Sequence, residues 1–254
     1  MTVRKGQWRG RRVLLALLVM VSAVAVVASA VFLSTGSEDA GSRWTADART
    51  TDGTDHLPLL TLPDSADVLV FGDSWTVGFG LDAVSDGYAY QVGPAMGWQV
   101  TVDGSGGTGY VNPGPGGVGT YATRLVTAAT DPPPALVVLQ GGLNDARLDL
   151  GELPSAAAAT VAVAQARFPG AQLVVFGPGT DTWPVDDRVE QADRILERVA
   201  AAAGVHYVSP IQEEWITATN FTEVIDPMTR HPSEEGHALL ARRLTEDLRA
   251  LLRG

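Results

Sequence analysis

Four short segments of this sequence carry side chains and backbone groups that could do chemistry together. They are residues 72–74 (Gly-Asp-Ser), 104–109 (Gly-Ser-Gly-Gly-Thr-Gly), 141–145 (Gly-Gly-Leu-Asn-Asp) and 226–233, which contains His231 followed by Pro232. A serine such as Ser74 becomes a nucleophile when a histidine accepts its proton. Backbone N–H groups and the amide of Asn144 could then stabilise the oxyanion that the attack produces. Each segment alone is a weak signal, because Gly-Asp-Ser usually marks only a turn.

Apolar, β-branched runs typical of buried strands precede these segments, and helix-patterned stretches separate the runs. The runs are residues 68–71, 100–102, 136–139, 173–176 and 205–208, and the helical stretches are 119–129, 155–168, 186–203 and 233–252. Alternating strands and helices predict an α/β domain with a mainly parallel sheet that helices cover on both faces. In such sheets functional groups gather beyond the carboxyl ends of the strands, and all four segments follow strand runs.

The N-terminal part of the chain reads as a membrane signal rather than as part of this domain. Residues 13–33 form an uncharged, largely apolar run behind a basic segment, 1–12. The run is long enough to span a bilayer, whereas a cleavable signal has an apolar core of about 7–15 residues. The basic flank would stay in the cytoplasm, which places the rest of the chain outside it. Residues 28–30 (Ala-Ser-Ala) resemble a cleavage site, so secretion is the alternative. We expect residues 34–57 to be a disordered linker and 58–254 to be the folded domain.

Charge and composition exclude several classes of function. The chain has no cysteine, and Lys5 is its only lysine, so thiolate metal sites and lysine chemistry in the folded domain are excluded. Its net charge is −11, and five of its 18 basic residues precede the apolar run. The remainder carries 13 basic against 29 acidic residues, a net charge of −16. Such an acidic chain repels nucleic acid and anionic lipid headgroups.

Taken in order, the four segments resemble the signature of the SGNH (GDSL-like) hydrolase family of serine esterases and lipases. That signature is Gly-Asp-Ser after the first strand, a glycine after the second, Gly-x-Asn-Asp after the third, and a late histidine followed by proline. The similarity extends over roughly residues 66–252. It implies a three-layer α/β/α fold with a five-stranded parallel sheet of flavodoxin-like order 2-1-3-4-5. This order would bring Ser74, Gly107 and Asn144 side by side.

The same resemblance implies roles for individual residues. Ser74 would be the nucleophile and His231 the base of an acyl-enzyme mechanism. The backbone N–H groups of Ser74 and Gly107 would form the oxyanion hole together with the Asn144 side-chain amide. Gly106 is a near competitor of Gly107 for this role, because the segment contains several glycines. Neither a metal nor another cofactor is implied.

The sequence departs from the family pattern at the acid that partners the histidine. The pattern has an aspartate three residues before the histidine, where this chain has Met228, and Asp226 lies five residues before His231. Either the loop is longer and Asp226 still orients the imidazole, or a backbone carbonyl does so. We adopt Asp226 as the third catalytic residue.

Other residues near these segments have simpler interpretations. We expect Asp73 and Asp145 to cap turns, and His237 to be a partly buried helical histidine. Residues 104–109 also satisfy Gly-x-Gly-x-x-Gly, but the prolines and glycines that follow cannot open a helix, so nucleotide binding is not expected. Aromatic residues nearby either line a substrate pocket or pack in the core, and both interpretations stay open: Trp75, Phe79, Tyr88, Tyr90 and Tyr110.

The sequence therefore predicts an extracytoplasmic serine ester hydrolase that acts on acetyl or short acyl esters, including esters of polysaccharides. One alternative is acyl transfer to a sugar hydroxyl through the same acyl-enzyme. A second is a catalytically silent glycan-binding domain, which the intact Ser74, Asn144 and His231 disfavour. The expected partner is a small-molecule or glycan ester, with no nucleic acid, and with membrane contact through the N-terminal segment only.

Overall fold

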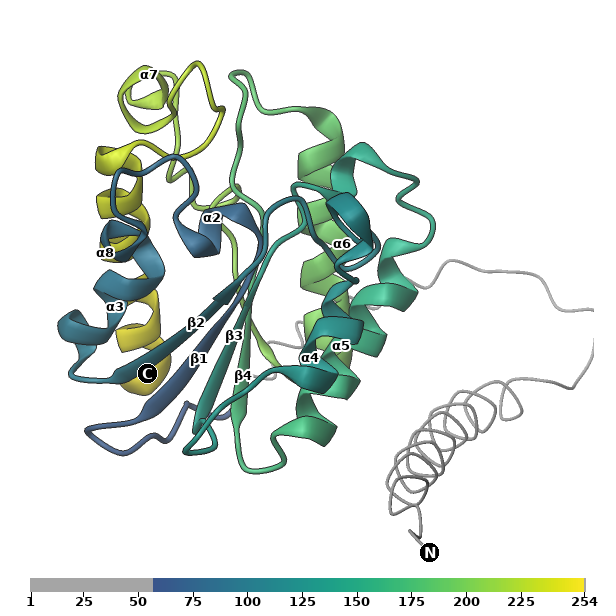
Figure 1. Cartoon of the computed structure of the whole chain (residues 1–254), viewed down its shortest axis with the longest axis vertical. Coiled ribbons are helices and arrows are strands. Elements are labelled where there is room, and N and C mark those ends of the chain that lie inside the picture. Colours follow the sequence, from purple (N-terminus) through teal and green to yellow (C-terminus); the bar gives the residue numbers. More distant parts are fainter. Residues whose placement is uncertain (1–56, 254) are drawn as a thin grey trace, which may run out of the picture. The chain divides into compact units, whose positions relative to one another are not determined.

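A five-stranded parallel sheet runs through residues 57–253, which are the residues that the computed structural model describes (Figure 1). The strands lie in the order β2-β1-β3-β4-β5, and every neighbouring pair is parallel. Their bounds are Asp67–Gly72 (β1), Gln99–Gly104 (β2), Leu136–Gln140 (β3), Gln172–Phe176 (β4) and His206–Val208 (β5). The predicted fold class and strand order are confirmed.

Helices cover both faces of the sheet (Figure 1). On one face α3 (Tyr88–Met96) packs against α8 (Glu234–Arg253), and on the other α5 (Leu153–Arg167) packs between α4 (Tyr121–Thr127) and α6 (Asp187–Ala203). Two further helices are short. Helix α2 (Ser74–Val77) follows β1, and α7 (Phe221–Val224) precedes the loop that contains His231. This is the three-layer arrangement that alternating strands and helices favour.

The long helices begin where the sequence supplies a cap. Ser233 caps α8, because its hydroxyl accepts a hydrogen bond from the Gly236 N–H at 3.1 Å. Two glutamates follow in the first turn and Arg253 lies in the last, which suits the helix dipole. Asp186 caps α6 by accepting from the Arg188 N–H at 2.8 Å. These caps fix where each helix leaves the sheet edge.

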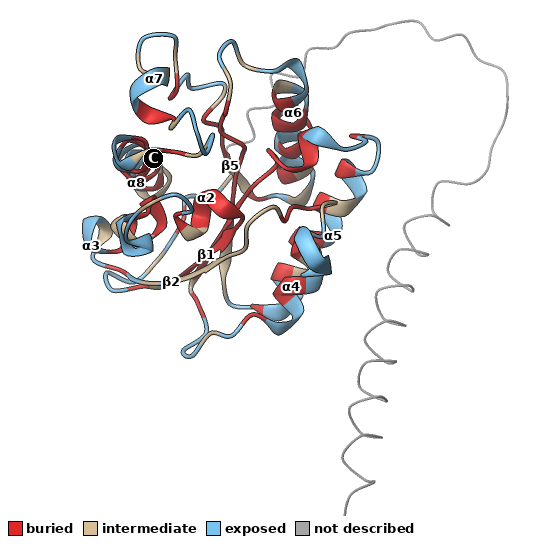
Figure 2. Cartoon of the chain, turned by 45° about the horizontal axis from the view of Figure 1, so that its top comes forward, coloured by how far each residue is buried: buried red, intermediate tan, exposed pale blue. Residues whose placement is uncertain are grey.

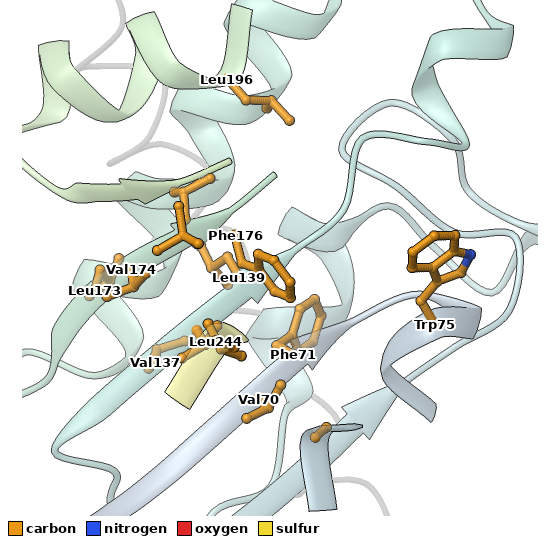
Figure 3. Packing of buried hydrophobic residues seen from close by; sticks show 14 of the residues in the cluster. Val70, Phe71, Trp75, Val137, Leu139, Leu173, Val174, Phe176, Leu196 and Leu244 are labelled. Atoms are coloured by element: carbon orange, nitrogen blue, oxygen red, sulfur yellow. The ribbon is translucent and has the colours of Figure 1, made fainter. Parts of the chain in front are cut away.

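The core lies on both faces of the sheet, and the interior strands β1, β3 and β4 are buried along nearly their whole length, whereas the edge strand β2 is partly exposed (Figure 2). Phe71 of β1 packs edge-on against Tyr121 of α4, with ring centroids 5.4 Å apart. Phe176 of β4 packs edge-on against Tyr88 of α3, at 5.7 Å. Figure 3 shows part of this hydrophobic core, with Phe71, Phe176 and Leu244 of α8 among the labelled side chains. Burying each such side chain stabilises the fold by about 1.5–3 kcal/mol.

Strand register brings the predicted site segments to one edge of the sheet. Gly72, at the end of β1, pairs with Gly104 at the end of β2. Phe71 of β1 pairs with Leu139 of β3 on its other side. Because β1 lies between β2 and β3, the residues that follow these three strands emerge next to one another. The turn at residues 72–74 (the serine turn) therefore lies between residues 104–109 (the glycine-rich loop) and residues 141–145 (the asparagine segment).

The predicted segments 1–12, 13–33 and 34–57 lie outside the described residues, apart from Leu57. The predicted anchor 13–33 is thus a sequence interpretation only. Within residues 57–253, no helix combines the length and apolarity that crossing a membrane requires.

Candidate active site

Ser74 lies at the turn between β1 and α2, where its side chain is largely buried. The Asp73 carboxylate caps this turn by accepting a hydrogen bond from the Trp75 N–H at 2.9 Å. A side chain at Gly72 is excluded, since a Cβ there would overlap Thr76 and lie 2.8 Å from the carbonyl oxygen of Gln140. Gly72 and Asp73 therefore each have a separate structural reason to stand at this turn, next to Ser74.

His231 lies against Ser74, although 157 positions separate them in the sequence. Its Nε2 is 2.9 Å from the Ser74 Oγ, and its Nδ1 is 2.7 Å from the backbone carbonyl oxygen of Thr229. A carbonyl oxygen only accepts hydrogen bonds, so in the neutral ring Nδ1 carries the hydrogen and Nε2 is left as an acceptor. This tautomer is the one that can take the serine proton. The exposed ring of Phe79 packs against the imidazole, with centroids 4.7 Å apart.

In the structure no hydrogen bond joins Asp226, the predicted third catalytic residue, to the imidazole of His231. The Asp226 Oδ1 instead accepts hydrogen bonds from the Met228 N–H (2.9 Å), the Thr229 N–H (2.7 Å) and the Thr229 hydroxyl (3.1 Å). These bonds, led by that of the Thr229 N–H, lower the pKa of the Asp226 carboxyl. The physical reason is the turn itself: Asp226 closes it and presents the Thr229 carbonyl to Nδ1. The backbone alternative is the one that this structure contains.

The glycine-rich loop after β2 reaches the serine turn through a backbone hydrogen bond from the Ser105 N–H to the Gly72 carbonyl oxygen, 3.1 Å long. A Cβ at Gly106 would lie 3.9 Å from the Ser74 Cβ, so this residue passes directly beside the serine. Gly107 has a left-handed φ of +74°, and a Cβ there would lie 2.9 Å from Pro115. Neither N–H donates to another residue within the described part of the chain. Gly106 and Gly107 thus both remain candidates for an oxyanion donor.

Asn144 bridges the segments that follow β1 and β2. Its Nδ2 donates to the Thr108 carbonyl oxygen at 3.0 Å and, less closely, to the Asp73 Oδ2 at 3.3 Å. The side chain is buried, with 8% of its surface exposed. The structure therefore brings an amide donor, a glycine-rich loop, a serine and a histidine to one place. That set can carry out acyl transfer from an ester to the serine.

The model of the GDSL-like lipase/acylhydrolase family matches residues 70–239, which include all four segments. The chain belongs to this family. It is therefore an ester hydrolase. A GDSL lipase of Mycobacterium tuberculosis is 32% identical over 183 residues, which cover 68% of this chain and 78% of that protein.

Solved structures share the fold of this GDSL-like hydrolase. A member of the lipolytic G-D-S-L family from Veillonella parvula has a TM-score of 0.55 and 20% identity, and the match covers 71% of this chain and 96% of that one. A carbohydrate esterase family 2 enzyme of Corynascus thermopiles, which carries a carbohydrate-binding domain, has a TM-score of 0.59 and 21% identity. That match covers 77% of this chain and 68% of the other.

Two buried aspartates hold the loops of this GDSL-like hydrolase in place, as interpreted from the sequence. Burial raises the pKa of Asp73 to about 7, against the opposing hydrogen bond from the Trp75 N–H. Burial also raises the pKa of Asp145, although hydrogen bonds from three backbone N–H groups, those of residues 110–112, oppose the change. The loop after β2 therefore folds around the Asp145 carboxylate, directly beside Asn144.

Sequence reasoning missed Arg124, a buried cation beneath the site. One terminal nitrogen donates to the Gly72 carbonyl oxygen and to the Thr108 hydroxyl, each at 2.8 Å, and the other pairs with the Asp103 carboxylate at 2.6 Å. Its guanidinium carbon lies 4.3 Å from the centroid of the Phe71 ring. The only available signal was a single arginine within a helical stretch, which normally indicates an exposed face.

The remaining sequence candidates separate into core and surface. His237 is fully buried, its Nδ1 accepts from the Tyr88 N–H at 3.2 Å, and burial lowers its pKa to about 4. Trp75, Tyr88 and Tyr110 pack in the core, whereas Phe79 is about half exposed beside His231. Among the described residues, no three His, Asp or Glu side chains lie together as a metal site would require.

Proposed function

We propose that this chain is an extracytoplasmic serine ester hydrolase that uses Ser74 and His231 and acts on acetyl or short acyl esters, including those of polysaccharides. The observation that carries the proposal is the contact of 2.9 Å between the Ser74 Oγ and the His231 Nε2. Nucleophile and base must lie within hydrogen-bonding distance for the proton to pass between them. The family membership of the chain supports the same chemistry.

In the proposed reaction, His231 Nε2 takes the Ser74 proton as the serine oxygen attacks the ester carbonyl carbon. The resulting oxyanion accepts hydrogen bonds from Asn144 and from backbone N–H groups of the serine turn and of the loop with Gly107. The Asn144 contact with Asp73 is long, at 3.3 Å, so this hydrogen is the one we expect to turn toward the oxyanion. The intermediate then expels the alcohol, which takes the proton from Nε2.

Water completes the proposed cycle by the same steps. Nε2 accepts a proton from water as the water oxygen attacks the acyl carbon, and the proton returns to Ser74 as the acid leaves. The Thr229 carbonyl oxygen accepts the Nδ1–H throughout, at 2.7 Å. Its partial negative charge steadies the imidazolium, the role that a carboxylate plays in a Ser-His-Asp triad. We thus propose a serine–histidine pair supported by the backbone.

The proposed substrate class and location rest on charge and likeness. Residues 57–253 carry 24 acidic and 11 basic side chains, which favours neutral substrates over anionic ones. A solved structure with the same fold is a carbohydrate esterase with a carbohydrate-binding domain. The basic segment and apolar run of residues 1–33 favour a location outside the cytoplasm, with the domain tethered to the membrane.

The test is hydrolysis by the full-length chain, purified in detergent, beside a Ser74→Ala control. Substrates are p-nitrophenyl acetate, butyrate and octanoate, and acetylated xylan. We expect hydrolysis of the short esters by the wild type and none above background by the control. Equal, negligible rates for two folded proteins on all four substrates would reject the proposal. Acetyl transfer to an added sugar in preference to water would instead identify an acyltransferase.

A further inference from the structure

The position of His231 depends on the backbone around it, since within residues 57–253 its Nδ1 contacts the Thr229 carbonyl oxygen and no carboxylate. Within the turn, the Asp226 N–H donates to the His231 carbonyl oxygen at 2.9 Å, and the Arg230 N–H donates to the Asp226 carbonyl oxygen at 2.8 Å. Arg230 has a φ of +57°, a left-handed conformation that few non-glycine residues adopt. Such a residue persists where its surroundings hold it.

The Arg230 side chain is held by a buried acid from another part of the sheet edge. Its Nη2 lies 2.9 Å from the Oδ2 of Asp181, whose side chain is only 5% exposed. Asp181 comes from the loop that follows β4. That loop packs on the serine turn, because a Cβ at Gly179 would overlap the ring of Trp75. Asp181 therefore connects the turn before His231 to the helix that begins with Ser74.

A second arginine, Arg147, binds the same Asp181 oxygen. The Arg147 Nη2 lies 2.8 Å from the Asp181 Oδ2, and its side chain is 59% exposed, close to the 55% of Arg230. The backbone around Arg147 has separate support, because the Ala146 N–H donates to Gly142 and the Arg188 Nε donates to the Ala146 carbonyl oxygen. Arg147 and Arg230 thus share one acceptor, but only Arg230 belongs to the turn before His231.

We propose that Asp181 is a positioning residue: by holding Arg230, it keeps the imidazole of His231 aimed at Ser74. The inference rests on the proposed function, in which His231 is the base. Since no carboxylate in the described part of the chain contacts Nδ1, the orienting acid is Asp181, which acts through the guanidinium of Arg230 and the backbone that joins Arg230 to His231. A displacement of about 1 Å in such a group lowers a rate by about 100-fold.

The test compares Arg230→Gln with Arg147→Gln in the full-length chain. Each change removes a guanidinium from Asp181, and glutamine at 230 meets the same left-handed backbone. For p-nitrophenyl acetate, we expect Arg230→Gln to lower kcat and kcat/KM together by about 10- to 100-fold. Arg147→Gln should stay within about threefold of the wild type, and Arg230→Lys should recover most of the loss. Thermal melting is measured for every variant.

Asp181→Asn and the double variant with Arg230→Gln complete the cycle. If Asp181 acts through Arg230, the double variant is no slower than either single one, because both remove the same contact. Equal effects of the two arginine variants would overturn the proposal, as would losses that only follow the melting temperature. A KM increase confined to anionic esters in both variants would also overturn it, because the arginines would then bind substrate. An inert wild type would reject the proposed function itself, whereas an active wild type with an active Arg230→Gln rejects only this inference.

Discussion

Asp226 makes no hydrogen bond to the imidazole of His231, so we expect Asp226→Asn to have only a small effect on kcat. In the structure its Oδ1 accepts all three hydrogen bonds of this side chain, and none of them comes from His231. Asparagine keeps an acceptor oxygen at the same place, so the turn and the Thr229 carbonyl should stay where they are. The change removes a charge near His231 without removing a contact to it.

The expected loss of kcat in Asp226→Asn differs by several orders of magnitude between a Ser-His-Asp triad and a serine–histidine pair supported by the backbone. In a Ser-His-Asp triad, replacing the aspartate by asparagine lowers kcat by about 10⁴-fold, because the imidazole then takes the wrong tautomer. Here the Nδ1 hydrogen points to a backbone carbonyl at 2.7 Å, which the substitution cannot alter. The remaining effect is that of one exposed charge, about two- to fivefold. Asp226→Ala, which removes the acceptor of all three bonds, should cost more, about tenfold, by loosening the turn.

The assay is kcat for p-nitrophenyl acetate at several pH values, with Ser74→Ala as the blank. Asp226→Ala is the matched control, because it removes the turn-closing hydrogen bonds of Asp226 as well as its charge. A loss of 10³-fold or more in Asp226→Asn, with unchanged melting, would refute this reasoning. It would mean that Asp226 reaches the imidazole during catalysis.

Four further predictions follow from the site and the core. Asn144→Ala should lower kcat by about 10²- to 10³-fold with little change in KM; an unchanged kcat would remove Asn144 from the oxyanion hole. Burial raises the pKa of Asp73 to about 7, above that of an unfolded chain, so its stabilising contribution is fully present below pH 3.8 and is lost as pH rises through about 7. Thermal melts from pH 5 to 8.5 should therefore show a larger fall for the wild type than for Asp73→Asn, and parallel curves would contradict this. Gly107→Ala, at a left-handed φ, should destabilise the fold by about 1–2 kcal/mol in urea titrations, and an unchanged midpoint would contradict the strain. Leu69→Ala, at a fully buried position on the interior strand β1, should lower the free energy of unfolding by about 2–5 kcal/mol, and a loss of less than about 1 kcal/mol would contradict the tight packing there.

The sheet could be predicted because its interior strands β1, β3 and β4 are continuous apolar runs. The run 136–139 was predicted one residue short of β3, and 173–176 one residue short of β4. Helix α3 was missed, since it contains Pro94 and two tyrosines, which obscure a helical pattern, and its place is fixed by packing against α8. The strand order came from the family resemblance, because no local pattern specifies which strands are neighbours.

At the site, side chains with distinctive types were predictable and backbone groups were not. Ser74, Asn144 and His231 follow strands in a recognisable order, and the structure brings them together. The Thr229 carbonyl that meets His231 has no signature, since every residue carries one. Asp226 was assigned by its type and proximity in sequence, but the hydrogen bonds of a turn decide where its carboxylate points.

The most direct test of the central claim is to trap the acyl-enzyme. The full-length chain is mixed with p-nitrophenyl acetate, quenched with acid within milliseconds and digested for peptide mass spectrometry, beside His231→Ala. The account predicts an acetyl group on Ser74 that appears with the burst of p-nitrophenol and is strongly reduced in His231→Ala. Hydrolysis with no acetyl on Ser74, or with Ser74→Ala as active as the wild type, would contradict it.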